Sequence, residues 1–291
     1  MIERLAILGV GLIGGSVALS LRSIGAVGRI IGSDRDRGHL ERAQHLGLID
    51  EAFDDPLKAV ERADLVLIAV PGGAFAPLMD HLAPAYRPEV VYTDTLSTKR
   101  GVHETLVARF GREPPNFIPG HPIAGAETSG PGAARLGLFE GRRVILTPTA
   151  SADPTALAKV IWLWEILGAS VSCLSPAQHD RILAATSHLP HVLSFVLMAL
   201  LAERDEEGKL FDYAAGGLRD LTRIAASDPR MWRDICLANR DVLVPLIERY
   251  AGALSQAAAK IQAEDADGLM ALFAEARNAR LLFTDPRESH S

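Results

Sequence analysis

The sequence predicts an α/β fold for the N-terminal part of the chain and an all-helical fold for the rest. Up to Ser175, short apolar runs rich in β-branched residues alternate with helical stretches, which is typical of βαβ units and a largely parallel sheet. A glycine-rich turn follows the first run directly. Beyond Ser175, apolar residues recur at spacings of three and four, which indicates helices.

Seven apolar runs are the predicted strands: 4–10, 29–34, 65–70, 90–95, 116–118, 143–148 and 170–175. The run 65–70 is closed by Pro71-Gly72-Gly73 and has the continuous apolar character of a central strand covered on both faces. We place the domain boundary at Ser175, which gives domains 1–175 and 176–291. The stretch around 192–201 is apolar almost all round, so we expect its helix to be buried between two subunits.

Composition excludes several classes of protein. The 291 residues are 48% hydrophobic, which excludes a disordered chain. The net charge is −6 and the basic residues are scattered, so we expect no nucleic-acid partner and no binding to an anionic membrane. The two cysteines, Cys173 and Cys236, form no disulfide framework, and we expect a cytoplasmic protein. The longest apolar run, 195–202, is shorter than the roughly 18 residues of a membrane span.

The glycine-rich turn Gly9-Val10-Gly11-Leu12-Ile13-Gly14 stands between a predicted strand and a predicted helix. In this context Gly9 permits a tight turn, Gly11 lets a pyrophosphate approach the backbone, and Gly14 lets the helix pack on the strand. The helix N-terminus offers free N–H groups to the phosphates. The sequence therefore predicts a dinucleotide-binding site, the alternative being that these are ordinary turn glycines.

The second predicted strand ends at Asp34, 20 residues after Gly14, where a carboxylate accepts hydrogen bonds from ribose hydroxyls. Because a carboxylate there repels a 2′-phosphate, NAD is favoured over NADP. NADP remains an alternative because Arg35, next to Asp34, is placed to contact a 2′-phosphate. The other interpretation of Arg35 is a solvated charge in a loop. The predicted cofactor-binding residues are Gly9, Gly11, Leu12, Ile13, Gly14, Asp34, Arg35, Val70 and Pro71.

Two segments, 94–99 and 119–130, follow predicted strands at the edge of the sheet where ligands bind. The second segment is punctuated by glycine and proline, which favours a fixed loop. His121 in this loop has the chemistry of a base that takes a hydroxyl proton. The alternative is a loop histidine held extended by the following Pro122.

Three motifs in this order resemble the prephenate and arogenate dehydrogenases of tyrosine biosynthesis. They are GHPIAG from Gly120, SHLPH from Ser187, and GGLRDLTRIA from Gly216 followed by DPRMW. The resemblance covers residues 1 to about 283. It implies a Rossmann-type N-terminal domain, an all-helical C-terminal domain that dimerises, and NAD-dependent oxidative decarboxylation of prephenate to 4-hydroxyphenylpyruvate.

The resemblance also implies roles for individual residues. His121 matches the catalytic histidine, and Ser97 matches a serine near the reacting hydroxyl. Arg223 matches the arginine that pairs with a substrate carboxylate, and His191 matches a second active-site histidine. Trp232 matches a residue close to the active site, although without the resemblance it is interpreted as a core or interface residue.

The role of Arg223 is chemically reasonable, because a guanidinium forms two parallel hydrogen bonds with a carboxylate. Asp220, three residues earlier, is expected to steady Arg223, the alternative being an exposed ion pair within a helix. Glu127 either joins this network or is solvated. Pro190 is expected to kink its helix and to aim Ser187 and His191 into the crevice.

Several alternatives stay open at this point. Nothing in the sequence decides between prephenate, arogenate and dual use. A dehydrogenase of the β-hydroxyacid type would need a catalytic lysine in the helical part, where Lys209 and Lys260 stand in no motif-like setting. A catalytically silent NAD-binding dimer would need no histidine in the crevice. We expect no metal, because His188 and His191 have no third ligand at helical spacing.

Overall fold

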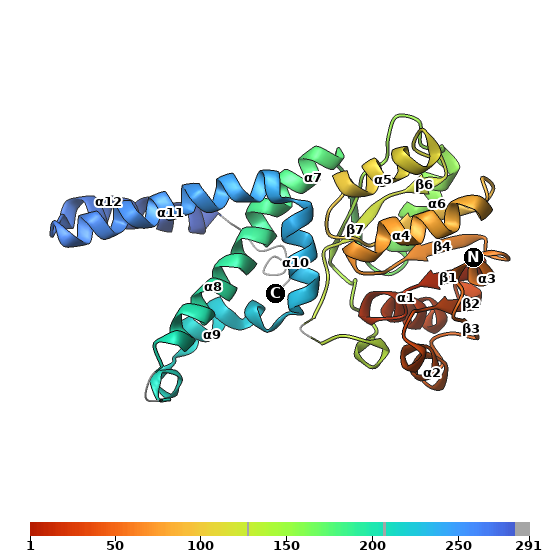
Figure 1. Ribbon diagram of the computed structural model, residues 1–291, viewed down its shortest axis with the longest axis horizontal. Helices are drawn as coiled ribbons and strands as arrows, with labels where there is room; N and C mark the ends of the chain where they lie inside the picture. The colour runs from red at the N-terminus through yellow and green to blue at the C-terminus, as the bar shows by residue number, and fades with distance from the viewer. Residues whose placement is uncertain (127, 206–207, 283–291) are drawn as a thin grey trace. The chain divides into compact units, whose positions relative to one another are not determined.

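The computed structural model describes residues 1–126, 128–205 and 208–282 (Figure 1). The chain divides into two compact units, Met1–Arg240 and Asp241–Ser291. The first unit holds the α/β part together with the beginning of the helical part, and it contains every residue of the candidate site.

The first unit is built on a six-stranded parallel sheet in the order β3-β2-β1-β4-β5-β6. The strands are β1 (Ile2–Leu8), β2 (Val27–Ser33), β3 (Glu51–Phe53), β4 (Leu65–Ile68), β5 (Val91–Asp94) and β6 (Phe117–Ile118). This order confirms the predicted Rossmann-type domain. The strand β3 was not among the predicted strands, because a three-residue strand shows no alternation to detect.

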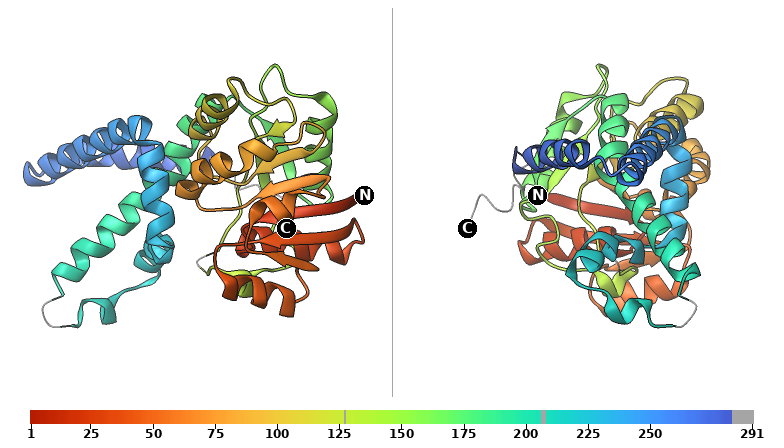
Figure 2. Two further views of the ribbon diagram at one scale, coloured as in Figure 1. Left: turned by 45° about the vertical axis from the view of Figure 1, so that its right-hand side comes forward. Right: turned by 90° about the vertical axis from the view of Figure 1, so that its left-hand side faces the viewer.

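Helices cover both faces of this sheet (Figures 1 and 2). Alternate strand residues pack into two different cores: Leu5 and Ile7 lie in one, Ala6 and Leu8 in the other. The first core is completed by α1 (Leu12–Ser23), α2 (Arg37–His45) and α6 (Pro154–Glu165), and the second by α3 (Pro56–Val60), α4 (Gly72–Leu82) and α5 (Arg100–Phe110). Burial on both faces explains the continuous apolar run of β4.

A second, three-stranded sheet follows, made of β7 (Gly120–Pro122), β8 (Arg143–Leu146) and β9 (Ser170–Cys173). β7 runs antiparallel to β8, which places His121 opposite Ile145. The prediction of a loop was therefore wrong for 120–122. Since β7 lies at the edge of its sheet, Pro122 is tolerated at the end of the strand.

The helical part of the first unit begins with α7 (Pro176–Leu183), a π-helical turn (Ala184–His188) and α8 (Leu189–Glu203). It continues with α9 (Gly216–Thr222) and α10 (Pro229–Ala238). Short 3-10 turns cover Ala83–Ala85, Pro131–Ala133, Leu210–Tyr213 and Arg223–Ala226. Pro190 lies in the first turn of α8, where its missing N–H is tolerated. The irregularity in this helix is therefore a π-helical turn that ends at His188, before Pro190.

The segment Pro176–Glu203 is long and apolar enough to cross a membrane by length and composition, and 22% of its most apolar window is buried. The core helix of a soluble protein meets the same criteria, so the absence of a membrane span stays a prediction. Within the segment, Val196 is 59% exposed and Leu200 is 48% exposed. An exposed apolar helix surface of this kind calls for a covering partner.

The described part of the second unit holds α11 (Arg240–Gln262), apart from its first residue, and α12 (Ala266–Leu282), the blue helices of Figure 2. In the turn between them Glu264 has a positive φ of 52°, and Lys260 pairs with Asp265 at 3.1 Å. Both helices carry exposed apolar side chains, among them Leu254, Ile261, Met270 and Phe273.

Candidate active site

The turn between β1 and α1 leaves the start of the helix open. Gly9 has φ 96°, and a Cβ atom there would overlap the carbonyl of Ala69. A Cβ at Gly14 would overlap the carbonyl of Gly9. Gly11 is the N-cap of α1, where no side chain caps the helix and a Cβ would meet nothing within 4 Å. The first N–H groups of α1 are thus available to a phosphate.

Asp34 follows β2 directly and lies beside this turn. One of its oxygens accepts a hydrogen bond from the N–H of Val10 at 3.1 Å, and the other from Asp36 at 2.9 Å. Arg35 is exposed. An open helix N-terminus beside a carboxylate fits a dinucleotide. Four other predicted cofactor residues border the same edge: Leu12 and Ile13 in the first turn of α1, and Val70 and Pro71 after β4.

A buried ion pair joins the loop after β5 to the strand that carries His121. Asp94 ends β5, accepts from the N–H of Leu96 at 2.8 Å and pairs with the ammonium of Lys99. The same ammonium donates to the carbonyl of Gly120 at 2.6 Å. Burial lowers the pKa of Lys99, and Asp94 opposes this effect. Ser97, half-buried, lies in the loop that this pair holds.

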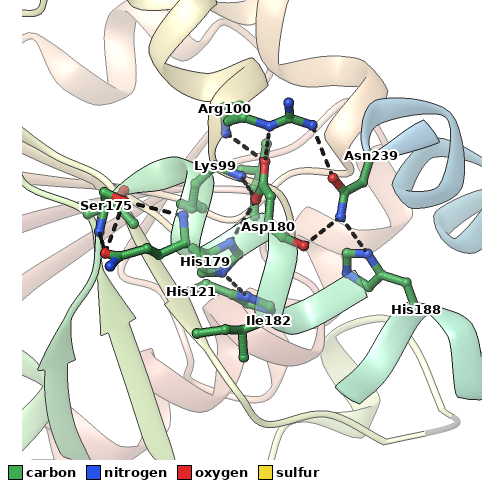
Figure 3. A network of polar contacts seen from close by, with 12 residues as sticks. Lys99, Arg100, His121, Ser175, His179, Asp180, Ile182, His188 and Asn239 are labelled. Carbon is green, nitrogen blue, oxygen red and sulfur yellow. Dashed lines mark hydrogen bonds and ion pairs between the residues drawn. The ribbon is translucent and has the colours of Figure 1, made fainter. Parts of the chain in front are cut away.

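His121 is buried and contacts a second histidine (Figure 3). Its Nδ1 lies 2.9 Å from Nε2 of His179, whose Nδ1 lies 2.8 Å from a carboxylate oxygen of Asp180. Among the described residues, Nε2 of His121 has no hydrogen-bond partner. Burial, and after it the charges of His179 and Lys99, hold the pKa of His121 well below its usual value of 6.5. The imidazole is therefore neutral and has one nitrogen left for a ligand.

The start of α7 explains why His179 and Asp180 lie here. Ser175 and Gln178 form a capping box, and Pro176 occupies the first turn, so the helix begins directly after β9. The first turn then brings Asp180 to the N-terminus of α5. There its two oxygens accept from the N–H groups of Lys99 at 2.7 Å and Arg100 at 3.0 Å.

Asn239 closes this network on the far side of Asp180 (Figure 3). Its amide nitrogen donates to the carbonyl of Asp180 at 2.9 Å and lies 3.1 Å from Nδ1 of His188, and its oxygen accepts from Arg100 at 3.2 Å. Burial lowers the pKa of His188 to about 4, against the opposing charge of Asp180.

A second group of predicted residues gathers at His191 on α8. Its ring stacks on Trp232 with a centroid distance of 3.6 Å, and its Nδ1 donates to the carbonyl of Ser187 at 2.9 Å. Burial lowers the pKa of His191, and the nearby charge of Arg223 adds to this effect. Arg223 is exposed and starts the 3-10 turn after α9, whose last turn carries Asp220. The group thus combines a half-buried imidazole with an exposed arginine.

Most of the predicted site residues thus fall into these groups, while Glu127 lies outside the described residues. Sequence reasoning gave no role to Lys99, His179, Asp180 or Asn239. The available signal was the Ser-Pro-x-Gln start of a helix followed at once by His-Asp, which places an ionisable pair in a first turn. Among the residues that the structure describes, no group of three His, Cys, Asp or Glu side chains is able to hold a metal ion.

Two family models match the chain. Residues 17–173 match the nucleotide-binding domain of prephenate dehydrogenase, and residues 175–275 match the dimerization domain of prephenate dehydrogenase. The two matches meet at the end of β9, before the capping box of α7.

Named relatives and solved structures agree with these models. The chain is 38% identical to cyclohexadienyl dehydrogenase of Zymomonas mobilis, covering 96% of this chain and 95% of that protein, and 34% identical to prephenate dehydrogenase of Bacillus subtilis, covering 96% and 76%. The crystal structure of prephenate dehydrogenase from A. aeolicus with hydroxyphenyl propionate and NAD⁺ superposes with a TM-score of 0.88 at 36% identity, covering 97% and 98%. The chain therefore belongs to the prephenate dehydrogenase family.

Proposed function

We propose that the chain is an NAD-dependent oxidoreductase that converts prephenate to 4-hydroxyphenylpyruvate and CO₂, a step of tyrosine biosynthesis. The observation that carries this proposal is the neutral, buried His121 on β7, one ring nitrogen of which has no hydrogen-bond partner among the residues that the structure describes. The family assignment and the open start of α1 support NAD as the cofactor. Bound NAD⁺ supplies the acceptor for a hydride.

His121 is the proposed base. Its Nε2 takes the proton of the C4 hydroxyl, the hydride leaves C4, and the electrons of the breaking C–COO⁻ bond enter the ring as CO₂ departs. The ring becomes aromatic, so no further activation of the carboxylate is required. Ser97, on the loop fixed by Asp94 and Lys99, is proposed to orient the hydroxyl.

Arg223 is the proposed anchor for the side-chain carboxylate of the substrate, because its guanidinium is exposed and lies near His191. His191 and Ser187 line the same end of the site. Asp220 is proposed to steady Arg223, and Glu127 to belong to the same polar edge.

Gly9, Gly11, Leu12, Ile13 and Gly14 are proposed to hold the pyrophosphate, and Val70 and Pro71 to border the cofactor after β4. Asp34 is proposed to bind the ribose and to favour NAD over NADP, with Arg35 beside it. Domain 1–175 would carry the cofactor, and domain 176–291 the dimer interface and part of the substrate site. We further propose a homodimer located in the cytoplasm.

Absorbance of NADH tests the activity. Purified protein is assayed with prephenate and with arogenate, each with NAD and with NADP, and His121→Asn serves as the control for contaminating dehydrogenases. We expect turnover of prephenate with NAD. The name of the Z. mobilis relative favours dual specificity, which predicts turnover of both substrates. Wild-type protein that reduces NAD with neither substrate would refute the proposed function.

Light scattering tests the dimer. The exposed apolar residues of α8, above all Val196 and Leu200, would lie in the interface. We expect twice the chain mass for the wild type and a shift toward the monomer for Leu200→Glu. Arg62→Glu, which also adds negative charge but lies on the α/β domain at an exposed position, is the matched control. A wild-type monomer at micromolar concentration contradicts the proposal.

A further inference from the structure

We propose that His179 and Asp180 are positioning residues that fix the tautomer of His121, with the proton on Nδ1 and the lone pair on Nε2. The inference rests on the proposed role of His121 as the base. It adds a chain of three side chains, Asp180, His179 and His121, from two elements that are 58 positions apart in the sequence.

The direction of each hydrogen bond follows from counting protons. A carboxylate only accepts, so at 2.8 Å from Asp180 the Nδ1 of His179 carries a proton. Burial lowers the pKa of His179, which makes the ring neutral and leaves its Nε2 as an acceptor. Since that acceptor lies 2.9 Å from Nδ1 of His121, the proton between the two rings belongs to His121.

Asp180, at the end of this chain, stays ionised because backbone N–H groups donate hydrogen bonds to its carboxylate. Burial alone would raise the pKa of Asp180, but hydrogen bonds from His179 and from the N–H groups of Arg100 and Lys99 outweigh it, and the pKa is lowered. The side chain of Arg100 adds a contact at 3.2 Å. With these donors in place the carboxylate has no freedom to rotate away from His179.

The fixed tautomer has a direct chemical consequence. A histidine with its proton on Nε2 would present a donor to the substrate hydroxyl and would be unable to accept its proton. Here Nε2 accepts the proton, and the resulting imidazolium keeps its Nδ1–H on His179, which in turn faces the negative charge of Asp180. The chain therefore selects the reactive form and stabilises the charge that develops on it.

Nitrogen NMR of the wild type tests the tautomer without any assay of activity. The protein is labelled with ¹⁵N-histidine, and the His121 resonances are assigned by their loss in His121→Asn. We expect Nδ1 of His121 to show the shift of a protonated nitrogen and Nε2 that of an unprotonated one, at a pH where the ring is neutral. The reverse assignment would overturn the proposal, whether or not the protein turns over prephenate.

Two substitutions at His179 test the effect on the reaction. His179→Leu removes the acceptor for Nδ1–H, and His179→Gln keeps an acceptor oxygen. We expect kcat to fall about 100-fold for Leu, toward the lower end of what a general base contributes, and to recover in part for Gln. The KM values for prephenate and NAD should change less than about threefold, because neither ligand touches His179.

His103→Gln is the matched control, since His103 is also buried and hydrogen-bonded to a carboxylate, at 2.6 Å from Glu113, but lies outside the chain to His121. It should lower the melting temperature and leave kcat unchanged. Equal kcat losses for the His103 and His179 variants would reduce His179 to a structural role and refute the proposal. If His179→Leu does not fold, the wild-type NMR result still decides. Failure of the proposed function would appear separately, as a wild type without turnover.

Discussion

The surroundings of His121 and those of His191 are two polar regions built in different ways. Behind His121, the side chains of Asp94, Lys99, His179 and Asp180 are buried and bonded to one another or to backbone groups of other elements. Around His191, Arg223 and Asp220 are exposed, on short helical turns.

The difference fits the roles that we propose for the two regions. A base works only in one tautomer and one position, so its supports are paired within the protein and are fixed before a substrate arrives. The proposed carboxylate anchor has to be reached by the ligand, which fits its place among exposed groups. The two regions should accordingly respond to substitution through different kinetic constants.

Loss of the base should have the largest effect. His121→Asn is expected to lower kcat by about 10² to 10⁴ while the Kd for NAD hardly changes. Steady-state kinetics and a cofactor titration measure the two quantities. A near wild-type kcat between about pH 6 and 9 would leave His121 as a structural histidine of β7.

Loss of the carboxylate anchor should appear in KM instead. Arg223→Ala is expected to raise the KM for prephenate by about 30-fold or more, the effect of truncating one partner of a charge pair, and to leave kcat within about tenfold. Arg223→Lys should recover only part of the loss, since an ammonium lacks the planar two-point contact. If KM stays constant and only the melting temperature changes, Arg223 forms a surface ion pair and not the anchor.

Replacement of Asp34 should change cofactor preference without affecting either region. Asp34→Ser removes the carboxylate beside the turn and is expected to lower kcat/KM for NAD by about tenfold, the value of one good hydrogen bond to a charged group, and to raise it for NADP. Arg37→Ser, an exposed position nearby, is the control. A wild type that already prefers NADP contradicts the reading of Asp34.

The smallest expected effect is on the pH at which kcat/KM begins to fall on the acid side of its pH profile. The base must be neutral to act, so kcat/KM falls as the pH drops through the pKa of His121. Because burial holds that pKa well below 6.5, the rate should stay constant from neutral pH to below pH 6.5. A limb at or above 6.5 would show that solvent reaches His121 in the free enzyme.

The sequence predicted the features that depend on local pattern. The glycine turn, the order of strands and helices and the position of Asp34 all follow from spacing within short segments, and each corresponds to an observed element. The motifs around His121 and His191 carry the resemblance, and the structure gives both histidines hydrogen-bond partners.

The features that escaped prediction depend on distant partners or on very short elements. His179 and Asp180 acquire their contacts from Lys99 and His121, which no periodicity connects to α7. The strand β7 is three residues long, and the π turn before Pro190 has no sequence pattern of its own. These are consequences of tertiary packing, which sequence periodicity does not encode.

The carboxylate of Asp94 has one more consequence, for motion. It bonds to the N–H groups of Leu96 and Gly120 and to the ammonium of Lys99, which in turn holds the carbonyl of Gly120. The end of β5, the Ser97 loop and the start of β7 are therefore linked through one buried ion pair. We expect the distance between Ser97 and His121 to vary less than the distance from either residue to Arg223, which lies on an exposed turn.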